Sequence, residues 1–479
     1  MTVPRSVLCV LCAGAWAAAL SAQQAPDRSH PPALGPTPAL HLPAIEKRTL
    51  SDGLPVWIMG VHKVPMVHLE LAVRAGIASD PAGKFGLSSL TADMLDEGAG
   101  SRTALEVADA IDFLGAELST NGATDASYVD LHVPVARLAD ALPIMADVIA
   151  RPRFPDAELK RLREERLAGL LEAQDDPEQL IQFAFPRMVF GPQHRYGTPA
   201  VGTAAGLRSI TIADLKAFHE SHYRPANAAL VVAGDVTADA ILPLLEKAFA
   251  GWKGAEAASP AAVPQAAQVP ARRVFLVDKP GAAQSQIRIG WIGVARSTPD
   301  YFALRVLNTI LGEAFTSRLN NNLREVHGYA YGAGSRFDMR LSPGPFYAAA
   351  GVQTDKTADA LKEFFVELDR IHPLVPADEL EKAKNYVALL LPRDFETTRS
   401  TANALAQMFV YGLPADYYET YGAHVRAVTA EDVKRVADKY IQPGKFDVVI
   451  VGDRKAIESG VKAMNLGPLT IVEPAEIFR

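Results

Sequence analysis

The sequence predicts an α+β fold that occurs twice, as two homologous domains in which a mainly antiparallel sheet packs with helices. Two apolar runs, Tyr223–Asp235 and Tyr440–Asp453, both pass from a tyrosine through a proline into a strand that ends in Gly-Asp. Their first residues lie 217 positions apart and their last residues 218. Thr211 and Thr429, each followed three positions later by an aspartate, are also 218 positions apart. This nearly constant offset indicates a duplicated unit of about 200 residues, which is too long a period for a solenoid repeat.

At 479 residues the chain is too long for one ordinary core, so we expect more than one domain. Changes of composition along the chain indicate where the domains begin and end. We predict a signal peptide over residues 1–22, a flexible leader over 23–46, and an N-terminal domain over 47–253. A linker over 254–271, composed mostly of Ala, Pro and Gln, precedes a C-terminal domain over 272–479. Each domain mixes strand-like runs with several amphipathic helices, which defines the α+β class.

The first 22 residues have the three parts of a secretory signal. Arg5 is the basic part, residues 7–20 form a short apolar run, and residues 20–22 (Leu-Ser-Ala) match a cleavage site. Cys9 and Cys12 are the two cysteines of the sequence, so the mature chain is expected to contain none and to need no disulfide after export. We expect an exported protein, in the bacterial periplasm.

Composition narrows the classes of partner. Apolar residues make up 49% of the chain and charged residues 22%, an ordinary soluble balance. The net charge of −7 and the lack of a Lys/Arg-rich patch argue against nucleic acid. No later stretch has the length of a membrane span, so none is expected after signal cleavage. No nucleotide-binding glycine loop and no GxSxG motif of serine hydrolases is present.

The N-terminal domain begins with a hairpin whose turn is Asp52-Gly53. A second strand is predicted over 67–75. Thr103 and Glu106 form a capping box at the start of a helix that ends at Gly115, and Thr211 caps another helix.

Between these two helices, residues 127–133 alternate polar and apolar, as in a half-buried strand. Helices are predicted over 136–150 and 156–173, and the second ends at the Asp-Asp-Pro of 175–177. The leucines expected on its core face are Leu159, Leu162, Leu167, Leu170 and Leu171.

In the C-terminal domain the segment 312–331, GEAFTSRLNNNLREVHGYAY, combines a helix, a turn and a strand. Gly328 suits the left-handed end of a helix. Arg324 and Tyr331 therefore lie on either side of a helix-to-strand turn. A guanidinium and a phenol held together can bind a peptide carbonyl or carboxylate. The alternative is an ordinary helix-end arginine and a packed strand tyrosine.

This segment resembles the second-domain signature of the insulinase/pitrilysin zinc-peptidase family, and the resemblance extends over residues 48 to 455. It implies the duplicated insulinase/pitrilysin-type domain of the family's half-length members. It also implies that Arg324 and Tyr331 bind substrate.

The family's zinc site is missing from the chain. Zinc is held by two histidines four positions apart, with a glutamate beside the second as general base and another glutamate from a later helix. In the matching positions this chain has Ser89 and Asp93 for the histidines, Ala92 for the base and Gly169 for the later glutamate. Serine and alanine cannot replace a zinc ligand or the general base, and no member of the family's set is retained, so we expect no metal, no other cofactor and no catalytic residue in this chain.

Other candidate ligands have simpler explanations. His219 and His222 are three apart and close a helix, where histidines commonly bond the last carbonyls. Asp93, Asp96 and Glu97 suit a solvated acidic helix face. His194 lies in a HRYG loop for which the sequence suggests no chemistry.

The resemblance implies a non-catalytic, substrate-binding subunit of a heterodimeric zinc peptidase. The partner would be a half-length chain with HxxEH that carries the zinc, and the ligands would be peptides. The chain would then be active only within such a metallopeptidase heterodimer. Two alternatives remain, a stand-alone peptide-binding or scaffold pseudoenzyme and a hydrolase with an unrecognised site. A processing-peptidase subunit is less well matched, because no glycine-rich loop precedes the motif.

Overall fold

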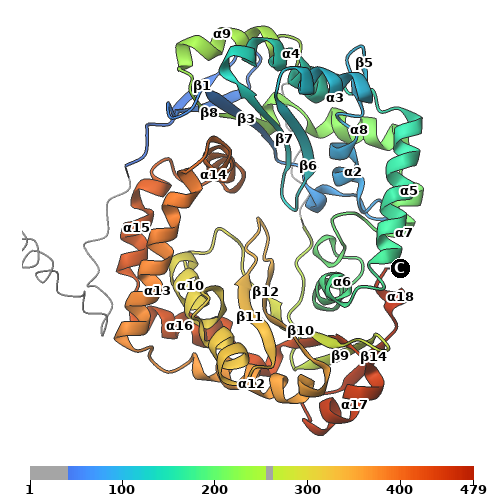
Figure 1. Cartoon of the computed structure of the whole chain (residues 1–479), viewed down its shortest axis with the longest axis vertical. Coiled ribbons are helices and arrows are strands. Elements are labelled where there is room, and N and C mark those ends of the chain that lie inside the picture. The colour runs from blue at the N-terminus through green and yellow to red at the C-terminus, as the bar shows by residue number, and fades with distance from the viewer. Residues whose placement is uncertain (1–40, 255–262, 479) are drawn as a thin grey trace, which may run out of the picture. The chain divides into compact units, whose positions relative to one another are not determined.

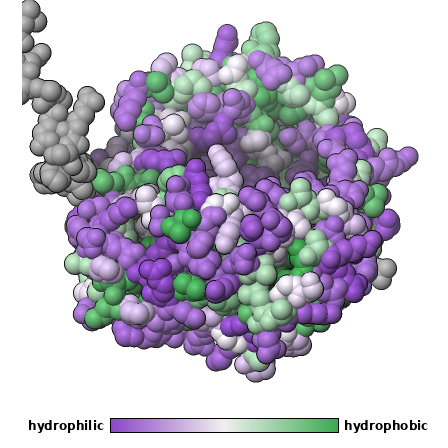
Figure 2. Space-filling model, turned by 60° about the horizontal axis from the view of Figure 1, so that its bottom comes forward, coloured by the Kyte–Doolittle hydropathy of each residue, from purple (hydrophilic) through white to green (hydrophobic). Residues whose placement is uncertain are grey.

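The structure, a computed structural model, describes residues 41–254 and 263–478. The predicted signal peptide, most of the leader and residues 255–262 of the linker lie outside these ranges. None of the helices within them combines the length and the hydropathy that a membrane span needs. Figure 2 shows one face of the molecule, where hydrophilic residues predominate and hydrophobic ones are scattered in small groups, as on an ordinary water-facing surface.

The first sheet has six strands from the N-terminal half of the chain. In spatial order they are β1 (Glu46–Thr49), β2 (Pro55–Gly60), β8 (Ala228–Gly234), β3 (Met66–Val73), β7 (Ser127–Pro134) and β6 (Glu117–Gly122). Only β2 and β8 are parallel neighbours, and the other pairs are antiparallel. A short pair, β4 (Gly98–Ala99) with β5 (Arg102–Thr103), lies apart from this sheet.

The second sheet, from the C-terminal half, repeats the same arrangement. Its six strands are β14 (Leu469–Val472), β9 (Arg273–Asp278), β13 (Asp447–Gly452), β10 (Gln284–Ile292), β12 (Pro345–Gln353) and β11 (Ala330–Phe337). The pair β9–β13 is parallel where β2–β8 is parallel, and three antiparallel pairs follow as in the first sheet. The sheets differ at one edge, where β14 runs parallel to β9. The predicted duplicated, mainly antiparallel α+β fold is confirmed.

Helices cover the sheets (Figure 1). Those of the N-terminal half are α2 (Leu87–Asp93), α3 (Ala104–Phe113), α4 (Leu138–Ala150), α5 (Asp156–Glu172), α6 (Pro177–Phe190), α7 (Ala204–Ser209), α8 (Ile212–His222) and α9 (Ala238–Phe249). Those of the C-terminal half are α10 (Tyr301–Asn308), α11 (Arg318–Asn320), α12 (Thr357–Arg370), α13 (Ala377–Leu390), α14 (Thr398–Tyr411), α15 (Tyr417–Ala427), α16 (Ala430–Tyr440), α17 (Arg454–Ala463) and α18 (Pro474–Ile477).

The two halves exchange one helix each. Helix α14 packs on β3 and β8 of the first sheet, and α6 packs on β10 and β13 of the second. The two helices are equivalents in the duplication, because their first residues, Pro177 and Thr398, lie 221 positions apart, close to the offset of the repeat. Each apolar core therefore includes residues of both halves, with Val449 and Val451 in the first core and Ala72 and Val231 in the second. This mutual burial binds the halves far more firmly than a linker would.

Most local predictions for the N-terminal half are confirmed. Thr103 and Thr211 form capping boxes at α3 and α8, and Gly53 adopts a φ of 92° in the turn between β1 and β2. One prediction is wrong, because Leu171 is 65% exposed while Leu159 and Leu170 are buried. Five leucines span too wide an arc of α5, so only part of the arc faces the core.

A buried carboxylate joins α10 to α16. Asp300 accepts hydrogen bonds from Arg435 Nη1 at 2.6 Å, Lys439 Nζ at 3.0 Å and the Tyr440 hydroxyl at 2.6 Å. Burial acts to raise the pKa of Asp300, but these hydrogen bonds outweigh it and lower the pKa to about 2. The charged carboxylate is thus favoured in the folded state.

The Asp300→Asn variant should lose stability in a pH-dependent way. Because the folded pKa lies below that of the unfolded chain, the stabilisation is present above pH ~4 and is lost as the pH falls toward ~2. Arg435 and Lys439 are exposed, so solvent weakens their attraction for Asp300. We therefore expect Asp300→Asn to lower the free energy of unfolding by about 1–2 kcal/mol at pH 6 and by less at pH 3. Guanidinium unfolding of both proteins at the two pH values measures this. An equal difference at both would contradict the ion-pair explanation.

Candidate functional site

The N-terminal end of α2, which carries the positions matched to the family's zinc ligands, is fixed by a buried carboxylate. Asp80 accepts the backbone N–H of Gly86 at 2.6 Å and that of Ser88 at 2.7 Å. Burial raises the pKa of Asp80 to about 6, against the lowering effect of these two bonds. Gly86 has a φ of 101°, and a Cβ there would lie 2.7 Å from Gly202 Cα, so only glycine fits this approach.

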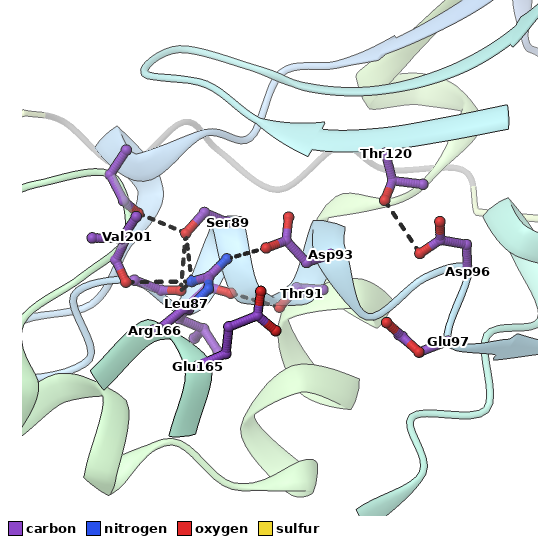
Figure 3. A network of polar contacts seen from close by, with 12 residues as sticks. Leu87, Ser89, Thr91, Asp93, Asp96, Glu97, Thr120, Glu165, Arg166 and Val201 are labelled. Carbon is purple, nitrogen blue, oxygen red and sulfur yellow. Dashed lines mark hydrogen bonds and ion pairs between the residues drawn. The ribbon is translucent and has the colours of Figure 1, made fainter. Parts of the chain in front are cut away.

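An arginine from α5 occupies the space between the two positions that match the zinc-binding histidines. Figure 3 shows the Arg166 guanidinium reaching Ser89 and Asp93 on α2. Its Nη1 donates to Ser89 Oγ at 3.0 Å and to the Val201 carbonyl at 3.3 Å, while Nη2 forms an ion pair with Asp93. The Arg166 side chain is only 10% exposed. Ser89 Oγ in turn donates to the Ala200 carbonyl at 2.6 Å, so the site is closed by its own hydrogen bonds.

These residues do not fit a zinc ion. A permanently charged guanidinium lies where a cation would have to bind, and its five N–H groups offer no electron pair to a metal. Ala92 is buried and provides neither ligand nor base. Gly169 lies nearly one turn beyond Arg166, and a Cβ there would have no neighbour within 4 Å. Arg166 was not predicted from the sequence, although it falls on the core stripe with Leu159, Leu162 and Leu170 at helical spacing.

The prediction of a solvated acidic helix face is wrong, because α2 ends at Asp93, and Asp96 and Glu97 lie beyond it and are half-buried. Glu97 forms an ion pair with Arg161 of α5. Asp96 accepts a hydrogen bond from Thr120 at 3.5 Å, and burial raises the pKa of Asp96 to about 6. These carboxylates serve the packing of α2 against α5 and β6.

The conspicuous histidines have structural partners. His219 Nε2 lies 2.7 Å from the Ile149 carbonyl oxygen, and His194 Nε2 lies 2.7 Å from that of Pro264. Burial lowers the pKa of His219, His194 and His222. Within residues 41–254 and 263–478, none of the three belongs to a group of side chains placed to share a metal ion.

The helix-to-strand turn around Arg324 is present in the C-terminal half. Arg324 lies in a π-helical turn, Asn321–Val326, and Gly328 follows with a φ of 65°. The Arg324 Cζ lies 5.3 Å from the centre of the Tyr331 ring and 4.5 Å from that of Phe315. The structure thus brings the predicted pair together and adds Phe315, which the sequence analysis did not single out.

A bulge in β11 determines how Tyr331 is presented. Ala330 pairs with Val352 in β12, but Ala333 pairs with Ala350. Two residues of β11 therefore face one residue of β12, which bends a strand and redirects side chains. Tyr331 is one of these two residues, and its side chain turns away from the sheet.

The group is open to solvent and its polar atoms are available. Tyr331 is 89% exposed and Phe315 65%, which is unusual for large aromatic residues. Among the residues that the structure describes, the Tyr331 hydroxyl makes no hydrogen bond, and the Arg324 side chain makes only an ion pair with Glu325 at 3.5 Å. A phenol and a guanidinium held by aromatic contacts, with free donors, form an arrangement that can bind a carbonyl or carboxylate.

Close backbone packing positions this group. Asn320 accepts the Ala333 N–H at 3.1 Å and donates to the Phe315 carbonyl at 2.6 Å, which links the strand to the segment before it. Gly312 lies directly on β11, where a Cβ would come within 2.1 Å of the Ser335 nitrogen. This contact packs the segment that precedes Arg324 against β11, the strand that carries Tyr331.

Gly312→Ala should therefore destabilise the C-terminal half. Overpacking a tight site costs about 1–3 kcal/mol, and backbone atoms cannot yield as a side chain can. Gly332→Ala is the matched control, because its Cβ would meet only Asn320 Oδ1 at 3.7 Å. Urea unfolding compares the two variants. Equal stability losses would show that the Gly312 contact is not special.

Two family profiles match the chain. Residues 59–194 match "Insulinase (Peptidase family M16)", and residues 209–387 match "Peptidase M16 inactive domain". A relative from Streptomyces coelicolor, named an uncharacterized zinc protease, is 25% identical over 401 residues, which are 82% of this chain and 86% of that protein.

Solved structures agree with these matches. A crystal structure of a peptidase M16 inactive domain from Pseudomonas fluorescens has 26% identity and a TM-score of 0.79, covering 85% of this chain and 97% of that one. A protease from Helicobacter pylori has the same fold, with a TM-score of 0.79 and 22% identity over 86% of this chain and 100% of that one. Since the two profiles together span well over half of the sequence, this chain belongs to the insulinase family, peptidase family M16, as a half-length member with the family's inactive domain.

Proposed function

We propose that this chain is the non-catalytic, substrate-binding subunit of a heterodimeric zinc peptidase. The observation that carries the proposal is the Arg166 guanidinium, which contacts both Ser89 and Asp93, the positions matched to the zinc-binding histidines. The half-buried Arg324 and the exposed Tyr331 have donor groups that could bind a ligand. The partner would be a half-length chain with HxxEH, which would hold the zinc that polarises the peptide bond.

Arg324 and Tyr331 would act on the peptide from this chain. Their N–H and O–H groups would donate hydrogen bonds to a carbonyl near the scissile bond and to the negative charge that develops on its oxygen. The two rings around the guanidinium limit its rotation, so little conformational freedom is lost when a peptide binds. An exported partner in the periplasm would meet this chain after removal of the predicted signal peptide.

Reconstitution tests this function. The purified mature chain alone should cleave no fluorogenic peptide, because it offers neither zinc nor a general base at the family's site. Mixed with a half-length HxxEH member from the same genome, it should raise peptide cleavage strongly above that of the partner alone. A stable complex without increased cleavage would favour the scaffold alternative. Cleavage by this chain alone would refute the proposal.

A further inference from the structure

A second group of polar side chains lies on a buried face of the first sheet. In the pairing of β3 with β7, His68 lies opposite His132 and Glu70 lies opposite Asp130. Because successive residues of a strand point to opposite faces, these four side chains share one face. Ala72, on the same face of β3, packs in the second core, so this face is turned toward α14.

Three of these side chains have donor atoms close together. His68 Nε2 lies 3.1 Å from Asp130 Oδ1, and one donor atom each of His68, Glu70 and Asp130 lies within 4.8 Å of the others. His68 is 0% exposed and Glu70 3%. Within the described part of the chain this is the one group of His, Cys, Asp and Glu side chains close enough to share a metal ion.

Apart from the contact between His68 and Asp130, polar atoms of this group have no protein partner among the described residues. Glu70 is buried and makes no hydrogen bond and no ion pair within residues 41–254 and 263–478. The Nδ1 atoms of His68 and His132 are also buried without a partner. A buried carboxylate without a partner is strongly disfavoured and requires either a proton or a cation.

We propose that His68, Glu70 and Asp130 form a binding site for a divalent metal ion, with Zn²⁺ as the ion that matches one imidazole nitrogen and two carboxylate oxygens. Tetrahedral zinc ligands lie about 2.1 Å from the ion and hence about 3.4 Å from one another, so small side-chain rotations would complete the site. The site lies on β3 and β7, not on the helices α2 and α5, which carry the positions matched to the family's zinc site. The sequence did not predict a metal ion on these strands.

The ion would have a structural effect. It would join two central strands beneath α14 and neutralise Glu70, in the region where the C-terminal half packs on the first sheet. The nearby guanidinium of Arg399, on α14, already forms an ion pair with Glu117. Glu117 is a residue of β6 and lies opposite His132 of β7. The positive charge of Arg399 also acts on Glu70, so Arg399 is a charged neighbour of the three-residue group.

Calorimetric titration of the metal-free mature chain with ZnCl₂ tests the site. We expect one bound ion per chain, and Glu70→Gln, which keeps the side-chain volume, should weaken binding by at least about 100-fold. Ser89→Ala is the matched control, because it alters the position of the family's zinc site and should leave binding unchanged. Zn²⁺ should also raise the melting temperature of the parent chain and the control, but not that of Glu70→Gln.

Two results would overturn the proposal. One is the absence of Zn²⁺ binding by the folded parent chain. The other is undiminished binding by Glu70→Gln, which would place the ion elsewhere. Asp130→Asn should show the same loss of Zn²⁺ binding, and it replaces Glu70→Gln as the test variant if Glu70→Gln does not fold. Magnesium should not substitute, because it prefers six oxygen ligands.

Discussion

Replacing Arg324 by alanine should lower the kcat of the reconstituted heterodimer by about 10²–10³-fold, the loss typical of one donor to a developing oxyanion. The guanidinium lies between two exposed rings and contributes little to the core, so the subunits should still associate. Tyr331→Phe removes one hydroxyl from a side chain that is 89% exposed and should act in the same direction. Steady-state kinetics on the purified pair measures both. If the two groups bind ground-state substrate instead, KM should rise while kcat holds.

Arg336→Ala is the control for these two variants. Arg336 is an exposed arginine of β11, the strand that carries Tyr331, and it lies beyond the bulge. Its replacement should leave kcat and KM unchanged. Unaltered kinetics in Arg324→Ala and Tyr331→Phe as well would make both residues structural and would favour the scaffold alternative.

Replacing Arg166 by methionine should destabilise the chain by about 3 kcal/mol. The change leaves Asp93 without its ion pair and removes donors from Ser89 and the Val201 carbonyl, and breaking a buried pair costs about 3–5 kcal/mol. We expect the lower end, because the Asp93 side chain is 37% exposed. Denaturant unfolding measures the loss.

Arg161→Met provides the comparison on the same helix. Arg161 forms ion pairs with Glu97 and Glu158 but is 50% exposed, so its loss should cost less than about 1 kcal/mol. The double variant Arg166→Met/Asp93→Leu should recover much of the stability, since no unpaired charge remains. A small loss of stability in Arg166→Met alone would mean that the contacts of the guanidinium with Ser89 and Asp93 contribute little to the folded state.

Local signals in the sequence predicted a large part of the fold. The capping boxes at Thr103 and Thr211 begin helices, and Gly328 ends one, because each signal depends on backbone groups within a few residues. The offset between Tyr223–Asp235 and Tyr440–Asp453 predicted the duplication, and β8 and β13 occupy equivalent places in their sheets.

Contacts between distant segments could not be predicted in the same way. The exchange of α6 and α14 depends on which apolar faces meet after folding, and amphipathic patterns do not specify a partner. Arg166 lies 73 positions from Asp93, so its pairing leaves no local pattern. The bulge that exposes Tyr331 depends on the register with β12, which the sequence of β11 does not show.

The central claim is that this chain binds the peptide while its partner performs the chemistry. The most direct measurement is peptide cleavage by the reconstituted pair in which the glutamate of the partner's HxxEH is changed to glutamine. Cleavage should disappear in this pair, although this chain should still bind the partner. With the unaltered partner, Arg324→Ala should reduce cleavage without abolishing it. Cleavage that persists with the altered partner would show that this chain is itself a peptidase.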